Sequence, residues 1–576
     1  MFHIMRWLTP YLLGFKLLLL GYHIANAHST AVEITIRDLT GPALVNVNNK
    51  LQETQARIAN PQAIKAWYLQ SLQDIREALE PFGYFKPKIQ SSLYRRTPYK
   101  YQAVYQISPG PLLPITSLRI QLTGAGRKDK ALQRILHTLP IRCGQTMTTE
   151  AYQQAKRFVY ESVVAEGYLD ATWEIHTAEI NRKAYTADIQ LTLNTGPRYV
   201  IAAINFTPTP LNTTFLARYL PFKLGDPYRL STILYAQDIL RKTDYFQQIS
   251  FQEPYPRPHT KEIPLTIALT PAPIHRYTAG IGFSTDTKFE FNPRIKLGWL
   301  ARHVTATGHR AALSTCLSKN YKNLSGVYSI PGRKPAIHQY HIQMGITQQR
   351  LKESTTFTQQ FSLSSSLQHA HWAHTSFISY QIGQFDQQQS EVKKFRFLMP
   401  GLIFDRKSME WSKKDQYKLN LRLQGALHSL FSDVSFFQAE WNSAYLYALN
   451  PSNHIVLRAR LGHTWVSQAN RLPPPLLFYE GGYRLRGYAH QQLGPGCSVL
   501  TLSGEYRYLL RDPLYLATFL DAGNAANGLP FLLKQGAGIG LVWSLPVGSL
   551  EVGIAKALDG SKHPWHFILG FRTDFL

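Results

Sequence analysis

The sequence predicts a multi-domain protein in which three tandem α+β modules precede a transmembrane antiparallel β-barrel of about 16 strands. Two observations carry this prediction: a strand–helix–strand pattern that repeats from residue 30 to residue 273, and alternating strands without helical periodicity from residue 274 to residue 576. Composition is a third, because aromatic residues form 12% of the chain, with 32 Tyr and 29 Phe. Aromatic side chains are enriched at both interfaces of a membrane barrel.

Composition excludes some classes of protein and some partners. Hydrophobic residues form 44% of the 576 residues and charged residues 17%, a balance typical of folded chains. The formal net charge of +26 favours anionic partners. The secretory start of the chain argues against nucleic acid, so we expect outer-membrane lipid, lipopolysaccharide and acidic client segments instead. Cys143, Cys316 and Cys497 are odd in number and widely spaced, which indicates neither a disulfide framework nor a CxxC site.

Residues 1–27 have the features of a signal peptide. Arg6 supplies a positive start, residues 11–20 a short apolar core, and residues 25–27 (Ala-Asn-Ala) a small-residue cleavage site. The alternative is a transmembrane anchor, which requires about 20 apolar residues and is interrupted here by Lys16. No later segment resembles a spanning helix, so insertion into a membrane would require a closed barrel.

The repeated pattern predicts three modules of similar plan. Each begins with a strand, continues with helices that end at a tyrosine-centred break (Tyr84, Tyr168 or Tyr245), and closes with an alternating strand before a proline. Strands and helices that share one apolar face form a compact α+β unit. The predicted modules occupy residues 28–111, 112–197 and 198–273.

The segment 274–576 predicts the barrel, and its alternation is clearest at the end of the chain. One face of the last strand carries Trp565, Phe567, Leu569, Phe571 and Phe575, and the other carries His566, Gly570, Arg572 and Asp574. An apolar face beside a polar face is the pattern of a strand with lipid outside and water inside. At about 10 residues per tilted strand plus turns, the segment holds about 16 strands. A soluble β-sandwich is the alternative, but it does not explain the aromatic terminal strand.

The most informative motif lies at residues 478–488, which read Phe-Tyr-Glu-Gly-Gly-Tyr-Arg-Leu-Arg-Gly-Tyr. Gly481, Gly482 and Gly487 permit tight or left-handed backbone. Arg486, which precedes Gly487 and Tyr488, presents a five-donor fork suited to a buried carboxylate. We expect eleven strands before this segment and five after it, which makes it the sixth outer loop.

Candidate partners for Arg486 follow in the next strands. Asp521 and Phe519 are two residues apart and therefore project from one face of a strand. Glu505 lies on the polar face of the preceding strand and is a second acceptor. The alternative for Asp521 is a turn aspartate before Gly523.

The motif resembles the Arg-Gly-Phe/Tyr loop of the BamA/TamA superfamily of outer-membrane insertases, in which the loop folds back into the barrel lumen. Residues 519–523 resemble the Phe…Asp-x-Gly strand that receives the loop arginine, and residues 277–286 resemble the glycine-rich first strand of TamA-type barrels. Gly553 departs from the family, which usually carries an aspartate there. The modules resemble POTRA domains. Their number fits the TamA type, since BamA-like proteins have five and two-partner secretion transporters have two.

The resemblance implies an outer-membrane protein of a Gram-negative bacterium, with periplasmic POTRA domains, that inserts or translocates autotransporters and other β-barrel proteins. Implied partners are unfolded outer-membrane protein clients and a TamB-like partner anchored in the inner membrane. A weak seam between the first and last strands would form a lateral gate at Gly280, Gly282, Phe571 and Phe575. The POTRA strand edges would capture clients by β-augmentation, or the modules serve only as spacers or docking surfaces. A two-partner-type secretion pore and a passive outer-membrane channel remain alternatives.

Motifs of catalysis are missing from the sequence. It contains no Gly-x-Ser-x-Gly elbow, no Walker loop and no HExxH, so we expect neither an enzyme nor a cofactor. His369, His371 and His374 form a cluster that can hold a metal. Residues of a barrel loop are the favoured alternative, because no carboxylate or cysteine accompanies them.

Overall fold

The computed structural model describes residues 31–56, 58, 62–97, 100–252, 260–285, 291–351, 354–369, 371–386, 392–408, 415–528, 532–545, 548–559 and 565–572. The predicted signal peptide and Phe575 lie outside these residues. The chain forms two compact units, one of residues 1–204, 223–233 and 253–265, the other of the remainder. None of the described helices combines the length and the apolarity that a membrane span requires.

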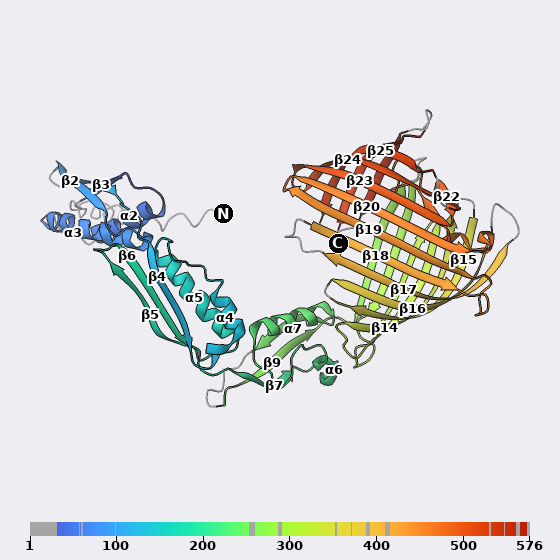
Figure 1. Ribbon diagram of the computed structural model, residues 1–576, viewed down its shortest axis with the longest axis horizontal. Coiled ribbons are helices and arrows are strands. Elements are labelled where there is room, and N and C mark those ends of the chain that lie inside the picture. The colour runs from blue at the N-terminus through green and yellow to red at the C-terminus, as the bar shows by residue number, and fades with distance from the viewer. Residues whose placement is uncertain are drawn as a thin grey trace, which may run out of the picture. The chain divides into compact units, whose positions relative to one another are not determined.

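The first unit contains two modules in which helices cover a three-stranded sheet (Figure 1). In each sheet the strand that opens the module lies parallel to the strand that closes it, and the closing strand is central. The first module comprises β1 (Ala31–Arg37), α2 (Gly41–Gln55), α3 (Ala63–Leu79), η1 (Glu80–Phe82), β2 (Lys88–Thr97) and β3 (Lys100–Ser108). The second comprises β4 (Ile115–Thr123), η2 (Ala125–Lys128), α4 (Lys130–Leu136), α5 (Thr149–Ala165), β5 (Thr172–Asn181) and β6 (Thr186–Asn194).

Helix α5 shows why these residues form a helix and how it is held on its sheet. The side chain of Thr148 accepts a hydrogen bond from the backbone N–H of Ala151 (3.1 Å), which caps the first turn. Ala155, Val159 and Val163 recur every four residues and are buried, so one apolar stripe faces the sheet.

Tyr168, in the break after α5, is buried and donates to Asp129 (3.0 Å), the N-cap of α4. Burial opposes ionisation of Asp129. Hydrogen bonds from Ala131 and Tyr168, together with the charge of Arg198, outweigh burial and hold the pKa of this carboxyl below its usual value. The tyrosine of this break therefore stabilises its own module.

The third module has the sheet order β7-β9-β8. It comprises β7 (Val200–Phe206), α6 (Thr213–Ala217), α7 (Leu230–Lys242), β8 (Phe246–Gln252) and β9 (Glu262–Pro271). Its break tyrosine contacts the barrel as well as its own module. Tyr245 is buried, packs edge-to-face against Phe215 and Tyr219, and donates to the carbonyl of Gly308 (2.6 Å), in the turn between β11 and β12. The guanidinium of Arg310 lies 4.2 Å from the Tyr245 ring centroid and donates to the carbonyl of Thr243.

The predicted barrel of about 16 strands is confirmed as one sixteen-stranded antiparallel sheet that curves round on itself (Figure 1). Its strands follow chain order, with eleven before the long loop at residues 467–497 and five after it. The eleven are β10 (His275–Thr285), β11 (Phe291–Ala301), β12 (Arg310–Ser318), β13 (Tyr321–Pro331), β14 (His338–Leu351), β15 (Ser354–Gln368), β16 (Trp372–Phe385), β17 (Lys393–Ser408), β18 (Asp415–Ala426), β19 (Phe436–Asn450) and β20 (Asn453–Val466). The five are β23 (Ser498–Arg511), β24 (Leu514–Ala526), β25 (Lys534–Leu545), β26 (Gly548–Ala557) and β27 (His566–Arg572).

Side chains of the barrel alternate between its two faces as the sequence predicts. On β27, Phe567, Leu569 and Phe571 face outward with exposed fractions of 46%, 46% and 52%. Ile568 and Arg572 face the lumen and are buried. The end at which β10 begins is called the near end below, and the opposite end the far end.

Candidate functional site: a loop seated in the barrel lumen

The loop at residues 467–497 joins β20 to β23 at the far end and is the sixth far-end loop. It contains η3 (Ala469–Arg471), η4 (Pro474–Leu476), and a small hairpin of β21 (Phe478–Glu480) and β22 (Leu493–Gly496). Its central residue, Arg486, has no exposed surface and contacts side chains of β23, β24 and β26. The loop is therefore folded into the lumen.

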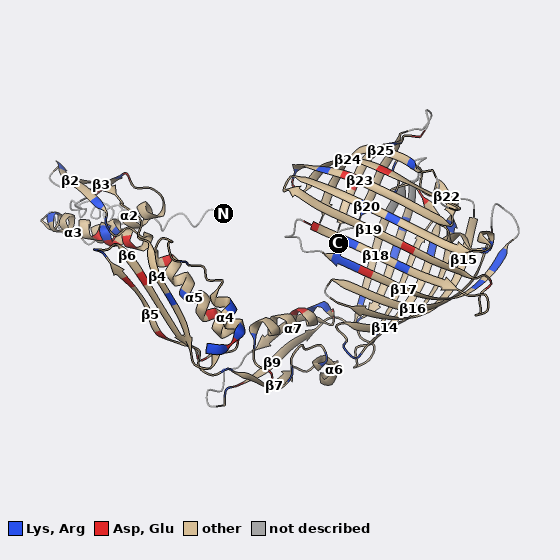
Figure 2. Ribbon diagram, viewed as in Figure 1, with Lys and Arg blue, Asp and Glu red and all other residues tan. Residues whose placement is uncertain are grey.

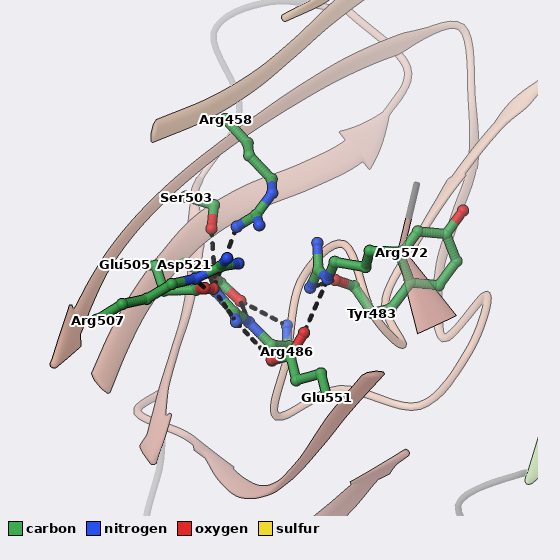
Figure 3. Close-up of polar contacts among 9 residues, drawn as sticks. All are labelled: Arg458, Tyr483, Arg486, Ser503, Glu505, Arg507, Asp521, Glu551 and Arg572. Atoms are coloured by element: carbon green, nitrogen blue, oxygen red, sulfur yellow. Dashed lines mark hydrogen bonds and ion pairs between the residues drawn. The ribbon is translucent and has the colours of Figure 1, made fainter. Parts of the chain in front are cut away.

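Arg486 and Asp521 form a two-pronged ion pair (Figure 3). Nε of Arg486 donates to Oδ2 of Asp521 (2.7 Å) and Nη2 donates to Oδ1 (2.8 Å). The backbone N–H of Arg486 also donates to Oδ2 (2.9 Å). Two parallel bonds orient the guanidinium as well as neutralise it. Asp521 is thus a lumenal acceptor rather than a turn residue.

The other predicted partners complete the pocket around the guanidinium. Phe519 lies beneath it, with 3.4 Å between Cζ of Arg486 and the ring centroid. Glu505 accepts from Nη1 (2.7 Å), and Ser503, on the same face of β23, accepts from Nη2 (3.0 Å). A cation buried this completely is tolerated because every face of it meets a carboxylate, a hydroxyl or an aromatic ring.

Two glycines allow the loop to approach the wall. Gly487 has φ +95°, and a Cβ there would lie 2.7 Å from the backbone of Lys556 on β26. On the wall, a Cβ at Gly536 of β25 would lie 1.8 Å from the carbonyl oxygen of Arg486. The loop backbone therefore lies directly against β25 and β26.

The remaining motif residues shape the loop and its tip. Gly481 and Gly482 also have positive φ, and the N–H of Gly482 donates to the carbonyl of Tyr488 (2.9 Å). Tyr488 is buried and donates to Asp559 (2.6 Å), just beyond β26. The structure thus brings together all the residues predicted for the loop and its partners.

Sequence reasoning missed the part of the network that continues from Arg486 to the last strand (Figure 3). Glu551 of β26 accepts from Nη1 of Arg486 through Oε1 (2.8 Å) and from Nε of Arg572 through Oε2 (2.8 Å). Arg572, on β27, also donates to the carbonyl of Tyr483 in the loop (2.7 Å). The sequence did contain an indication of this extension. Glu551 is the only carboxylate on the lumenal face of β26, and it lies two residues before Gly553, where the family usually carries an aspartate.

Two further arginines hold Glu505. Arg458 of β20 donates to its Oε2 (3.1 Å) and Arg507 of β23 to its Oε1 (2.6 Å). Glu505 therefore keeps two cations even without Arg486, whereas the contacts to Asp521 described above all come from Arg486.

A second anchor holds the beginning of the loop. Arg460 of β20 donates to Glu440 of β19 (2.9 Å) and pairs with Glu480 of the loop. With this anchor included, the wall of the network has four arginines (458, 460, 507 and 572) and four carboxylates (440, 505, 521 and 551). The loop adds one of each, Arg486 and Glu480. Formal charge in the network is thus balanced with the loop seated and with the loop removed.

An apolar cluster lies in the lumen at the far end, where porin-type barrels are polar. Phe397 has no exposed surface and contacts Phe395 and Phe436 with ring centroids 5.7 and 5.6 Å apart. The loop contributes Leu472 and Leu476 to the same cluster. Gln438 on β19 donates to the carbonyl of Leu476 (2.9 Å), which fixes the loop against the cluster.

The two ends of the sheet are not joined by a ladder in the part of the chain that the structure describes. The strand order begins at β10 and ends at β27, and no register pairs one with the other. Every residue of β10 from His275 to Ile281 is exposed. A Cβ at Gly282 would meet nothing within 4 Å, and at Gly280 only Lys296 Cβ at 4.0 Å. Phe571 faces outward on β27.

The predicted histidine cluster, Cys143 and Cys316 lie away from this network, and Cys497 is the last residue of the loop. His369 stacks on Trp372 (4.2 Å between centroids), and His374 stacks on Phe404 (4.9 Å). Within the described ranges, no group of three or more His, Cys, Asp or Glu is arranged to hold a metal. The three cysteines are free; Cys143 is exposed, Cys316 half-buried and Cys497 buried.

Comparison with known proteins identifies a family match for the barrel and another for the first module. A family model described as the Omp85 superfamily domain matches residues 276–572, and one described as POTRA domain TamA domain 1 matches residues 33–109. The crystal structure of BamA from Haemophilus ducreyi lacking POTRA domains 1–3 is 14% identical, with a TM-score of 0.64 over 80% of this chain and 98% of that chain. CdiB from Acinetobacter baumannii is 14% identical, with a TM-score of 0.46 over 88% of this chain and 98% of that chain. At such identities the likeness to BamA shows a shared fold.

Proposed function

This chain belongs to the Omp85 superfamily of outer-membrane insertases and translocases, and from that premise we propose that it inserts or translocates autotransporters and other β-barrel proteins through a lateral gate between β10 and β27. The observation that carries the proposal is the unjoined strand order at these two strands. The near end of the barrel and the POTRA domains face the periplasm in this proposal.

An unjoined edge is unfavourable in a membrane unless it has a use. Lipid offers no hydrogen-bond partners, so each unpaired backbone group costs several kcal/mol. Proteins usually cover or shorten such edges. Here Gly280 and Gly282 add little packing to β10, which keeps that edge easy to separate from a neighbour. A client's terminal strand that pairs with an edge would satisfy the backbone and begin client insertion by β-augmentation.

The modules supply a second set of strand edges. Strands β2 and β5 are ten residues long and lie at the edges of their sheets. We propose that they receive unfolded clients in the periplasm before the gate does. The match of residues 33–109 to a TamA-type POTRA domain supports a TamB-like, inner-membrane-anchored partner.

A passive channel is less well supported, because the far end of the lumen holds the apolar cluster around Phe397 and the seated loop. Hydrated solutes pass through polar, open lumens. An ion-conductance measurement in planar bilayers separates the two functions. We expect a mostly closed barrel, and a steady large conductance would favour the channel.

The decisive experiment closes the proposed gate covalently. In a background in which Cys143, Cys316 and Cys497 are replaced by serine, cysteine pairs are scanned between residues 278–282 of β10 and residues 567–571 of β27 until one forms a disulfide. Client insertion into lipid vesicles is then measured oxidised and reduced. We expect insertion to stop in the oxidised protein and to return on reduction.

The matched control is a disulfide far from the seam. Met344→Cys on β14 and Phe361→Cys on β15 are direct ladder partners, and this pair should leave insertion unchanged in both redox states. Full insertion by the oxidised seam variant would exclude the lateral gate. Loss of export of a single exoprotein, with barrel insertion intact, would instead favour the secretion pore.

A further inference from the structure

The contacts of β27 inside the barrel point to a role for its lumenal arginine. We propose that Arg572 is a positioning residue that couples the seating of the lumen loop to the position of the last barrel strand. This inference rests on the proposed lateral gate, since β27 forms one side of it. In physical terms, β27 and the lumen loop move together.

Two connections join the loop to β27. The direct one is the hydrogen bond from Nη2 of Arg572 to the carbonyl of Tyr483 (2.7 Å). The indirect one passes through Glu551, whose two oxygens are divided between the two arginines: Oε1 accepts from Arg486 and Oε2 from Arg572, each at 2.8 Å. Since a carboxylate with one oxygen on each arginine cannot shift without loosening one of the bonds, Glu551 transmits displacement in either direction.

Burial makes the hydrogen bonds of these two connections strong and directional. The side chains of Arg572 and Glu551 are 8% and 3% exposed, and that of Arg486 is fully buried. Charge-assisted hydrogen bonds shielded from water are stronger and more directional than those at a surface. Arg572 is also the last residue of the described strand, opposite Ser549 of β26, so it acts at the near end of β27, where a periplasmic client would arrive.

Balance of charge makes the coupling reversible. The four arginines and four carboxylates of the wall still match when the loop, with Arg486 and Glu480, is withdrawn. Withdrawal therefore leaves no net buried charge to oppose it, although Asp521 must find a new partner. Withdrawal removes the hydrogen bond between Arg572 and the carbonyl of Tyr483, and with it one restraint on β27, while Arg572 keeps Glu551. A seated loop keeps the last strand in place, and a withdrawn loop releases it.

The test is amide hydrogen exchange of the full-length protein in lipid, followed by mass spectrometry, on Arg572→Ala, Arg572→Lys, Glu551→Gln and Arg486→Ala. We expect Arg572→Ala to accelerate exchange in the loop segment 478–488 as well as in β27, on the order of tenfold, since charged hydrogen bonds are lost at both places. Arg486→Ala should reciprocally accelerate exchange in β27. Arg572→Lys and Glu551→Gln, which keep the fold more closely, should give the same pattern with smaller effects.

Lys407→Ala is the matched control. Lys407 lies on the same face of β17 as the lumenal Phe397, opposite Lys418 of β18, and takes part in none of the network contacts described above, so its loss should change exchange in neither segment. If the Arg572 variants accelerate β27 alone, or if Arg486→Ala leaves β27 unchanged, the coupling is overturned. These outcomes do not depend on clients: failed coupling leaves the gate proposal intact, and failed client insertion by the wild-type protein would reject the gate while leaving the coupling measurable.

Discussion

The lumenal wall of the barrel has two contrasting regions built from the same strand geometry. Strands β14, β15 and β16 carry one charged side chain, Arg350, and the lumenal face of β15 presents Thr358, Gln360, Ser362, Ser364 and Ser366. Strands β20 to β27 carry the arginines and carboxylates that hold the loop, and in Figure 2 the ribbons of this region are marked in blue and red, whereas those of β14 and β16 are largely tan.

The difference indicates what holds the loop in place. A hydrated, neutral wall requires no partners, whereas buried charge is stable only where each ion is paired. The charged residues of β20 to β27 therefore specify one position for the loop. The neutral strands β14 to β16 offer no ion pairs that would hold it elsewhere. The loop is positioned by ion pairs and by close backbone approach.

The largest expected effect tests the ion pairs. Arg486→Ala leaves Asp521 without the cation that makes its contacts, a change that typically costs about 3–5 kcal/mol at a buried pair. We expect the barrel to remain inserted, as judged by heat-modifiable gel mobility, while client assembly is strongly impaired. Asp521→Ala should act in the same direction but less, because Arg486 keeps Glu505 and Glu551. Wild-type client assembly in both variants would remove the loop from the mechanism.

An intermediate effect tests the close approach by comparing one glycine from each wall. Gly536→Ala would place its Cβ 1.8 Å from the carbonyl oxygen of Arg486, whereas the nearest atom at Gly345 of β14 is 3.6 Å away. Overpacking of this kind costs about 1–3 kcal/mol. We expect Gly536→Ala to expose the loop to limited proteolysis and Gly345→Ala to resemble wild type. Equal protection of the loop in both would contradict the close seating.

The smallest effect compares one hydroxyl from each wall. Ser503→Ala removes the acceptor for Nη2 of Arg486 (3.0 Å) and should lower the free energy of unfolding by about 1 kcal/mol. Ser364→Ala on the neutral wall makes the same chemical change and should have no measurable effect. Urea unfolding of both variants in the same lipid vesicles provides the measurement, and an equal loss from both walls would remove the distinction between them.

Sequence alone predicted the barrel, its strand number and the place of the loop, because a period of two along a strand determines which face each side chain takes. The same period places Phe519 and Asp521 on one face, and their resemblance to the superfamily's Phe…Asp-x-Gly segment indicated Arg486 as their partner. Glu551 and Arg572 were not found, because their partners depend on how far the loop reaches across the lumen, which strand periodicity does not encode. The tyrosine breaks are a similar case. They recur in the sequence, yet Tyr168 contacts Asp129 of its own module and Tyr245 contacts Gly308 of the barrel.

The contact between Tyr245 and Gly308 has a mechanical consequence for the barrel. Segment 243–245 contacts the turn between β11 and β12 through Tyr245 and the beginning of β12 through Arg310, and Asp244 pairs with Arg276 at the start of β10 (2.9 Å). Tension on the third module is thus delivered to the first edge strand, while the last edge strand is restrained from within the lumen. Strand β10 is thus held from outside the barrel by the third module, and β27 is held from inside by the lumen loop. A client that pulls from the periplasm therefore applies different forces to the two strands of the seam.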